Sequence, residues 1–308
     1  MPSLSVLITY HNEEGLLTRC LESFDHQPID EIIIFDDAST KRPEPYIRKL
    51  SIPTRVVRSR ENVGPAHGRN RLLREASSEY VHFHDSDDWV TPQWGERVQE
   101  VIQTGADAVF TEVSSFRNGQ PVVELVQELR FMDTRDPVPY AITHFLLVPS
   151  GTYRKTVVER MGGYSDHWQS EDYYFHVKLL STRPRVAVIL EPLVGIDLRT
   201  TSRSTQTVEV WSCTLDVLRQ LSEELEPRHQ SALAEMAHHA GTVLFAAHSS
   251  DKAREAFSFS QALGGAKLVT RNWLYRGIAK VSPMMAERVG AFYRVCLPPA
   301  LRERVKGK

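Results

Sequence analysis

The first third of the chain alternates short apolar runs with segments of helical spacing. The runs are rich in β-branched and aromatic residues, which favour strands; they cover Ser5–Tyr10, Glu31–Phe35, Thr54–Arg58 and Tyr80–His84. Between them, apolar residues recur every three or four positions, as on one face of a helix. Strands joined through helices pair in parallel by right-handed crossovers. The alternation therefore predicts an α/β fold: a Rossmann-like, mostly parallel sheet with flanking helices.

A cluster of polar residues follows each of these four runs. The clusters are Thr9–Asn12, Asp36–Ser39, Asn62–Gly64 and Asp85–Asp88. Ligands of open α/β sheets bind beyond the carboxyl ends of the strands, so these clusters predict a site at that edge. No Gly-x-Gly-x-x-Gly follows the first run and the chain has no P-loop pattern, which argues against a dinucleotide site and a P-loop.

The middle of the chain continues this pattern less regularly. An Asn-Gly pair between strand-like runs predicts a hairpin within residues 116–135. Residues 145–149 are expected to form a strand and residues 151–154 a turn. A further strand is expected at residues 185–190, after a helix that begins near Glu171.

The chain becomes helical after residue 206 and basic after residue 265. We expect a domain over 1–205, a helical extension over 206–265 and a basic amphipathic segment over 266–308. The last segment has ten Lys/Arg against two Asp/Glu, interleaved with aromatic residues. This composition suits an anionic membrane surface. A basic helix packed on its own domain is an equally good interpretation, and both stay open.

Composition excludes several classes of protein. Lys and Arg number 37 against 39 Asp and Glu, so no global charge indicates nucleic acid. Cys20, Cys213 and Cys296 lie far apart without metal-site spacing, which fits a reducing compartment. No apolar run reaches the ~20 residues of a membrane span, and no signal peptide is recognisable. We expect a cytoplasmic protein, with association at the inner face of the membrane as a further option.

Three carboxylates lie within four residues at Asp85, Asp87 and Asp88. Such close like charges repel unless a cation lies between them, and Mg²⁺ favours this kind of ligand together with substrate phosphates. A solvated turn is the alternative. His82 and His84 share one face of the preceding strand; a two-His metal site is conceivable, but packed core histidines are favoured.

These clusters together resemble the inverting family 2 glycosyltransferases with the GT-A fold. The resemblance covers about residues 3–205 and rests on five short motifs in order: Thr9-Tyr10-His11-Asn12, Asp36-Asp37-Ala38-Ser39, Asn62-Val63-Gly64 with Arg69-Asn70, Asp85-Ser86-Asp87-Asp88, and Glu171-Asp172. It implies transfer of a sugar from a nucleotide-diphosphate sugar, first of all a UDP-sugar, to a hydroxyl with inversion. It also implies a divalent metal, Mn²⁺ or Mg²⁺, and a role in cell-surface polysaccharide or glycoconjugate synthesis.

The resemblance also assigns roles to residues on the donor side. His11 or Tyr10 would stack on the base, Asp37 would accept from the base or ribose, and Arg69 would approach the base or diphosphate. Asp87 would hold the metal with support from Asp85 or Asp88. The full donor-binding set that it implies is Thr9, Tyr10, His11, Asn12, Asp37, Asn62, Gly64, Arg69, Asp85 and Asp88.

On the acceptor side the resemblance makes Asp172 the general base, with Glu171 beside it. Trp168 would offer an apolar face to a sugar ring, and Arg199 and Arg203 would lie in a basic loop over the diphosphate. The family often has glycine ahead of the acidic pair, where this chain has Trp168-Gln169-Ser170, so the acceptor pocket is expected to differ. The expected acceptor is a saccharide or a lipid-linked molecule, and no nucleic acid is expected.

Two other functions are weighed against this one. A nucleotidyltransferase also uses a Rossmann-like sheet and paired acids, but it leaves Glu171 and Asp172 unexplained. A catalytically inactive GT-A module could serve as a binding or assembly partner, and the intact Asp87 and Asp172 argue against that.

Overall fold

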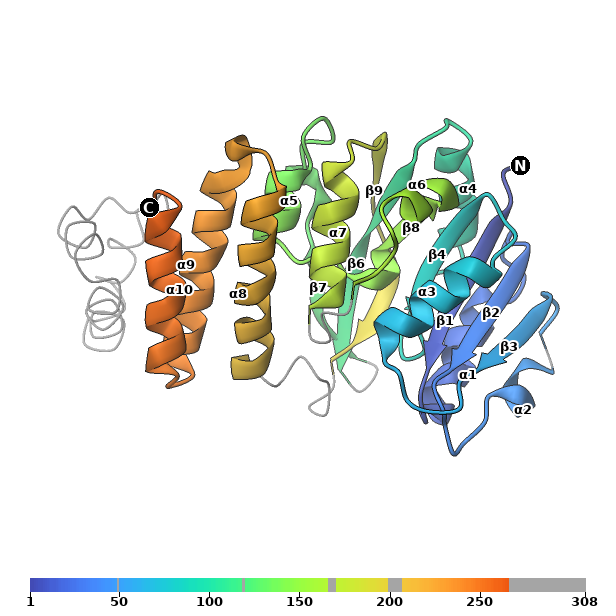
Figure 1. Cartoon of the computed structure of the whole chain (residues 1–308). Coiled ribbons are helices and arrows are strands. Elements are labelled where there is room, and N and C mark those ends of the chain that lie inside the picture. Colours follow the sequence, from blue (N-terminus) through green and yellow to red (C-terminus); the bar gives the residue numbers. More distant parts are fainter. Residues whose placement is uncertain (49, 118–119, 166–169, 199–206, 266–308) are drawn as a thin grey trace. The chain divides into compact units, whose positions relative to one another are not determined.

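Strand β1 (Leu4–Tyr10) lies inside a sheet whose first four strands run in parallel (Figure 1). The computed structural model describes residues 1–48, 50–117, 120–165, 170–198 and 207–265. β1 pairs in parallel with β2 (Glu31–Asp36) and β4 (Tyr80–Asp85), and β2 pairs with β3 (Thr54–Arg58). The connecting helices are α1 (Glu14–Phe24), α2 (Glu44–Ile47) and α3 (Pro65–Glu75). The predicted parallel sheet with flanking helices is confirmed for this half.

The second half of the sheet is mixed. Its strands are β5 (Trp89–Val90), β6 (Ala108–Arg117), β7 (Gln120–Gln127), β8 (Gly151–Arg154) and β9 (Val186–Asp197). β8 lies between β4 and β6 and is antiparallel to both, whereas β9 runs parallel to β6 and antiparallel to β5. The sheet order is β3-β2-β1-β4-β8-β6-β9-β5, and β7 pairs with β6.

The expected hairpin is formed by β6 and β7, which pair antiparallel. The expectation for residues 145–154 was wrong in its order. Val148–Ser150 is a 3₁₀ turn, and the strand follows it at Gly151–Arg154. Pro149 has no amide hydrogen to donate to a neighbouring strand, which favours a turn at this point.

Four further helices belong to this part of the chain. They are α4 (Trp94–Ile102), α5 (Val138–Thr143), α6 (Lys155–Arg160) and α7 (Glu171–Ser181), and a 3₁₀ turn covers Leu129–Phe131. Helix α7 begins directly at the acidic pair that the sequence singled out.

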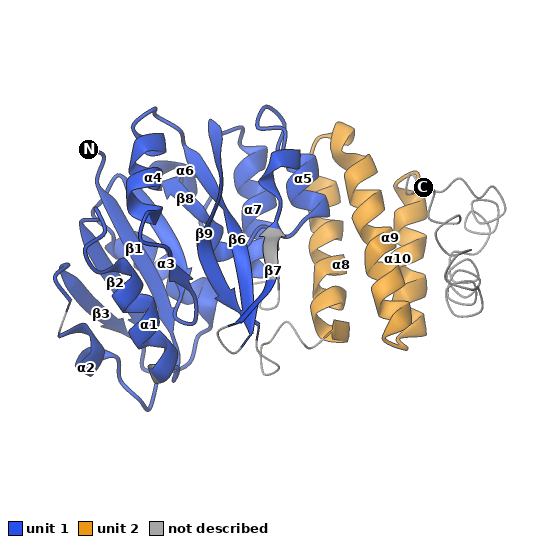
Figure 2. Cartoon of the chain, turned by 180° about the vertical axis from the view of Figure 1, so that it is seen from behind, with its two compact units in different colours: residues 1–202 blue, residues 203–308 orange. Residues whose placement is uncertain are grey.

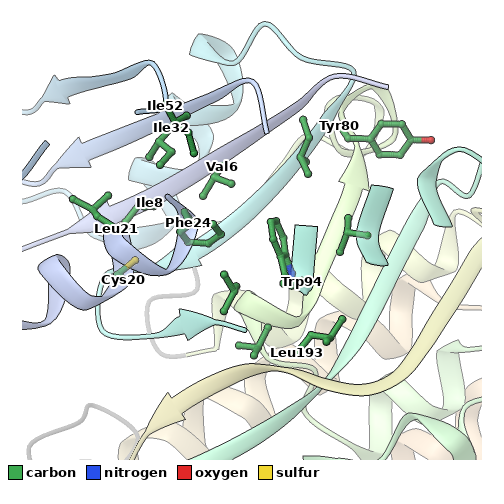
Figure 3. Packing of buried hydrophobic residues seen from close by; sticks show 14 of the residues in the cluster. Val6, Ile8, Cys20, Leu21, Phe24, Ile32, Ile52, Tyr80, Trp94 and Leu193 are labelled. Atoms are coloured by element: carbon green, nitrogen blue, oxygen red, sulfur yellow. The ribbon is translucent and has the colours of Figure 1, made fainter. Parts of the chain in front are cut away.

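The pleat of the sheet divides its side chains between two faces. Val6 and Ile8 of β1 pack with Phe24 of α1 and Trp94 of α4 in one cluster of buried residues, as Figure 3 shows. On β4, His82 and His84 contact Phe24 on this same face, whereas Phe83 contacts Phe175 of α7 on the other. Because side chains alternate along a strand, Thr9 and Asp85 face the side of α3 and α7.

The chain divides into two compact units, residues 1–202 and residues 203–308 (Figure 2). In the second, α8 (Thr207–Glu224), α9 (Gln230–Ala246) and α10 (Ser250–Ala262) pack together around Leu215, Leu244 and Phe257. Gly241 lets α9 approach α10, since a Cβ there would lie 2.7 Å from the Phe257 ring. None of the helices in the described part of the chain is long and apolar enough to cross a membrane.

Candidate active site at the carboxyl ends of the parallel strands

The ends of β1, β2 and β4 lie level with one another. Tyr10 is the register partner of Asp36, and Thr9 is the register partner of Asp85. The Thr9 hydroxyl donates to Oδ1 of Asp85 over 3.2 Å. The structure therefore brings the first, second and fourth polar clusters to one edge of the sheet, as the strand pattern predicted.

Arg69 of α3 is buried at this edge between two carboxylates. Its guanidinium donates to Asp85 Oδ1 at 2.8 Å and to Glu171 Oε1 at 2.9 Å, and only 3% of the residue is exposed. Burial alone would lower the pKa of the guanidinium, but Asp85, Tyr164 and Glu171 outweigh this and raise it. Burial is the largest single influence on the pKa of Asp85 and would raise it, but the charge and hydrogen bond of Arg69, with His84 and Thr9, together lower this pKa.

Arg69 is paired inside the protein, and its side chain is 4% exposed. Its carbon lies 5.1 Å from the centre of the Tyr164 ring, so an aromatic side chain covers it as well. In this structure Arg69 joins the end of β4 to the start of α7. Its expected contact with a base or diphosphate stays a prediction.

Asp172 lies in the first turn of α7, next to Glu171. Its Oδ1 accepts from the backbone N–H of Tyr173 at 2.8 Å, and the side chain is half-buried. Burial, followed by the charge of Glu171, raises the pKa of Asp172 to about 7, although Arg69 acts in the opposite direction. A carboxyl with such a pKa can exchange a proton near neutral pH.

The loops after β1, β2 and β3 are joined through Asp37 and Asn12. Asp37 Oδ1 accepts from the backbone N–H of Val63 at 2.8 Å, and Oδ2 accepts from that of Gly64 at 2.9 Å. Asn12 adopts the left-handed conformation with φ 57°, and its Oδ1 accepts from Thr40 and Lys41. Glu13 is the N-cap residue of the helix α1 that follows.

His11 lies exposed between these loops. Its Nδ1–H donates to the Asp37 carbonyl at 2.7 Å, which leaves Nε2 to accept from the Asn12 amide at 3.1 Å. The Asn62 amide lies 3.4 Å from His11 Nδ1. His11, Asn12 and Asn62 are thus exposed beside the strand ends, and the buried Asp37 and Gly64 join the loops that carry them.

One candidate, Tyr10, is a core residue instead. Tyr10 is 1% exposed and donates its hydroxyl to the Lys41 carbonyl, so its ring is not available to a base in this structure. Asp36 is fully buried and accepts from Ser39 N–H and Arg58.

His82 and His84 are also buried, as the favoured interpretation of packed core histidines predicts. His82 Nε2 lies 3.1 Å from His84 Nδ1, and burial lowers the pKa of both rings, that of His84 to about 4. Both imidazoles are therefore neutral at physiological pH.

The turn after β4 contains Asp87 and Asp88. Arg19 of α1 donates to the backbone carbonyl of Asp87 at 2.9 Å, and Asp88 is 7% exposed. Across residues 1–48, 50–117, 120–165, 170–198 and 207–265, no three His, Cys, Asp or Glu side chains are grouped to hold a metal.

The sequence interpretation missed two supports of this site. Arg19 lies 3.8 Å from the centre of the Trp89 ring, directly behind the acidic turn. Asn70 binds the backbone of Tyr164 twice, as donor to its carbonyl and acceptor from its N–H, both at 2.8 Å. Asn70 stands beside Arg69 in the quoted motif, but the sequence analysis gave it no role. Trp168, Arg199, Arg203 and the segment 266–308 lie outside the described residues.

Known proteins resemble the chain in sequence and in fold. The sequence model of Glycosyl transferase family 2 matches residues 5–162. The putative glycosyltransferase EpsH of Bacillus subtilis is 35% identical over 115 residues, covering 35% of this chain and 33% of that protein. An uncharacterized glycosyltransferase of Haemophilus influenzae is 29% identical over 188 residues, covering 58% of this chain and 62% of that protein. The matches thus span less than two thirds of these relatives.

Solved structures share the fold at low identity. The crystal structure of Staphylococcus aureus TarS 1–349 in complex with UDP-GlcNAc superposes with a TM-score of 0.70 at 19% identity, covering 95% of this chain and 91% of that one. The mannosyltransferase PcManGT of Pyrobaculum calidifontis, in complex with GDP-Man and Mn²⁺, gives 0.60 at 15% identity, covering 96% and 87%. The predicted GT-A fold is confirmed. Because the family model matches about half of the chain and spans the strands and loops of this edge, the chain belongs to glycosyl transferase family 2.

Proposed function

We propose that the chain transfers a sugar from a nucleotide-diphosphate sugar, first of all a UDP-sugar, to a hydroxyl with inversion. The observation that carries the proposal is Asp172, a half-buried carboxylate with a pKa raised to about 7 at the carboxyl edge of the sheet. Family membership supplies the reaction class. A raised pKa suits a general base, since a base works best when its pKa lies near the working pH.

Asp172 would take the proton of the acceptor hydroxyl. As that proton leaves, the hydroxyl oxygen bonds to the anomeric carbon of the donor, and the bond from this carbon to the diphosphate breaks. A single in-line displacement of this kind inverts the anomeric carbon. Glu171 pairs with Arg69, so we assign the proton transfer to Asp172 and a supporting role to Glu171.

The donor nucleotide would lie against the exposed His11, Asn12 and Asn62, in loops that the buried Asp37 and Gly64 hold together. The exposed His11 ring offers a face for a base, and its Nδ1–H is held by the Asp37 carbonyl. One protein of the same fold was crystallised with UDP-GlcNAc and another with GDP-Man. Hydrolysis of UDP-sugars and of GDP-mannose therefore has to be compared.

A divalent metal fits the acidic turn if the donor supplies ligands. Mg²⁺ commonly binds one or two carboxylates together with substrate phosphates. Asp87 would hold the metal, with Asp85 beside it, because the Asp85 side chain keeps 32% of its surface exposed although it is paired with Arg69. When bound, the metal would neutralise charge on the leaving diphosphate.

The acceptor we propose is a saccharide or a lipid-linked molecule of a cell-surface polymer. Its support is the family itself: the relatives include a poly(ribitol-phosphate) β-N-acetylglucosaminyltransferase, TarS, of Staphylococcus aureus, 25% identical over 201 residues. A cytoplasmic protein that contacts the inner membrane face through residues 266–308 would suit such acceptors. Flotation of the full chain with anionic and with neutral vesicles tests this; equal binding to both would contradict it.

Hydrolysis of donor sugars tests the proposed activity. Purified chain is incubated with UDP-glucose, UDP-GlcNAc or GDP-mannose, with and without Mn²⁺, and nucleotide release is measured. We expect one donor to be hydrolysed, and Asp172→Asn to lower the rate at least ~10²-fold, the usual size of a general-base contribution. Asp251→Asn is the matched control, since Asp251 is also an acid in the first turn of a helix and its side chain is 97% exposed.

The other outcomes separate the alternatives. Nucleotide binding without release of product would favour the inactive module, and formation of pyrophosphate from a nucleoside triphosphate and a sugar phosphate would favour the nucleotidyltransferase. A full rate in Asp172→Asn would refute the assignment of the base.

A further inference from the structure

Arg69 occupies a place that donor binding does not explain. It is a buried cation whose two carboxylate partners come from distant parts of the chain, Asp85 at the end of β4 and Glu171 at the start of α7. An arginine fork presents several N–H groups in a fixed plane, so it can hold two carboxylates in a defined relation. Lysine has a single point charge and cannot copy this geometry.

A second contact from the neighbouring residue supports the same part of the structure. Asn70 clamps the backbone of Tyr164 with two hydrogen bonds of 2.8 Å. Gly163 makes room for this, because a Cβ there would lie 2.3 Å from Asn70 Oδ1. The Tyr164 ring then stacks on Phe175 of α7, with ring centres 4.0 Å apart and planes 4° from parallel.

Two consecutive residues of α3 therefore hold α7 in place, one through charge and the other through the stacked Tyr164. We propose that Arg69 is a positioning residue that fixes Glu171, and with it the neighbouring Asp172, relative to Asp85 without touching the donor. Asp172 begins the same helical turn as Glu171, so a shift of that turn would move the base away from the acceptor oxygen. This inference rests on the proposed function, because it takes Asp172 as the base.

The positioning role separates the rate of the reaction from donor binding. Misplacing a catalytic group by about 1 Å can cost ~10²-fold in rate. Apart from the bond between them, the side-chain hydrogen bonds of His11 and Asp37 within the described residues go to Asn12, Asn62, Val63 and Gly64 and not to Arg69. Arg69→Met should therefore lower kcat for donor hydrolysis ~10²-fold. The dissociation constant of UDP should change by less than about threefold when calorimetry is done without metal, which excludes any effect through Asp85 as a metal ligand. The kcat of Arg69→Lys should lie between those of Arg69→Met and the wild type, since lysine keeps the charge but can reach only one of the two carboxylates.

Arg71→Met is the matched control on the same helix. Arg71 is half exposed and pairs with Glu75 one turn further on, so both kcat and UDP binding should stay at the wild-type level. Guanidinium ions added to Arg69→Ala should restore part of kcat, which a general loss of folding would not allow.

The reverse pattern would overturn the inference. If Arg69→Lys or Arg69→Met weakens UDP binding in proportion to kcat/KM while kcat is unchanged, Arg69 contacts the donor. If Arg69→Met does not fold, Glu171→Gln replaces it, with the same expected loss of kcat and unchanged UDP binding. An inactive Asp172→Asn together with a fully active Arg69→Met would reject the positioning role alone, and an active Asp172→Asn would reject the proposed base.

A measurement without substrate completes the test. The losses of melting temperature in Arg69→Met and Glu171→Gln should not add in the double variant, because both remove one interaction. Simple additivity would show that the pair is not coupled and would also reject the positioning role.

Discussion

Glu171 and Asp172 are consecutive in the chain, yet their carboxylates have different partners. Glu171 accepts from Arg69 at 2.9 Å, while Asp172 accepts from the backbone N–H of Tyr173 at 2.8 Å. A guanidinium thus balances the first acid inside the protein. The second acid has its pKa raised by burial and by its neighbour, and this difference determines the pH behaviour of the site.

Activity should rise with pH through about 7, the raised pKa of Asp172. Only the carboxylate can accept a proton, so below this pKa the active fraction falls about tenfold per pH unit. The measurement is log kcat/KM for donor hydrolysis against pH, with Asp251→Asn expected to superpose on the wild type. An acid limb near pH 4, the usual range of an aspartate, would contradict it.

The same carboxyl should reduce stability at neutral and alkaline pH. The pKa of Asp172 is higher in the folded than in the unfolded protein, so the folded protein binds the proton more tightly. The loss of folding stability caused by the ionised carboxylate is therefore complete above the folded-state pKa and absent below the unfolded-state pKa. Asp172→Asn should therefore melt about 2–4 °C higher at about pH 8 and at the wild-type temperature near pH 3. Thermal unfolding at both pH values decides, and a lower melting temperature at the higher pH would refute the sign.

Asp37→Asn should disturb the loop after β3. Both oxygens of Asp37 accept backbone N–H groups, from Val63 and Gly64, and an amide would turn an NH₂ toward one of them. An unsatisfied buried donor costs about 1–3 kcal/mol, so melting temperature and UDP affinity should both fall. Asp133→Asn, at an exposed carboxylate, is the control. Unchanged UDP affinity in Asp37→Asn would separate this loop from the donor.

Gly195→Ala should damage the support of the acidic turn. A Cβ at Gly195 would lie 2.3 Å from the Trp89 ring, which lies against Arg19 and so against the Asp87 carbonyl. Overpacking of this kind costs about 1–3 kcal/mol, and donor hydrolysis should fall with it. Gly15→Ala is the matched control, because a Cβ added at Gly15 would have nothing within 4 Å. Equal melting temperatures in both variants would show that Trp89 can move freely.

The parallel strands and their polar ends were predictable because both signals are local. β1, β2 and β4 are continuous apolar runs, and the residues after them mark the edge of the sheet. The same continuity hid which side chains face inward: a strand buried on both faces has no alternation of polarity. Tyr10 was therefore assigned to the base, although its parity places it with Val6 and Ile8 in the core.

The long-range partners could not be predicted. The position of β8 between β4 and β6 depends on pairing over about 70 residues of chain, and a four-residue strand leaves little pattern of its own. The burial of Arg69 depends likewise on carboxylates 16 and 102 residues away. In the sequence Arg69 is one cation on a helix. Its carboxylate partners are known only once α7 is seen to pack on the same face of the sheet as α3.

The alternation along β4 also limits how this chain can diverge. Its histidines pack against Phe24, and Asp85, one residue further, faces Thr9 and Arg69. Deleting or inserting a single residue within the strand would exchange these faces and turn a carboxylate toward the aromatic core. The length of β4 is therefore tied to two requirements at once, an aromatic core on one face and the Asp85–Arg69 ion pair on the other.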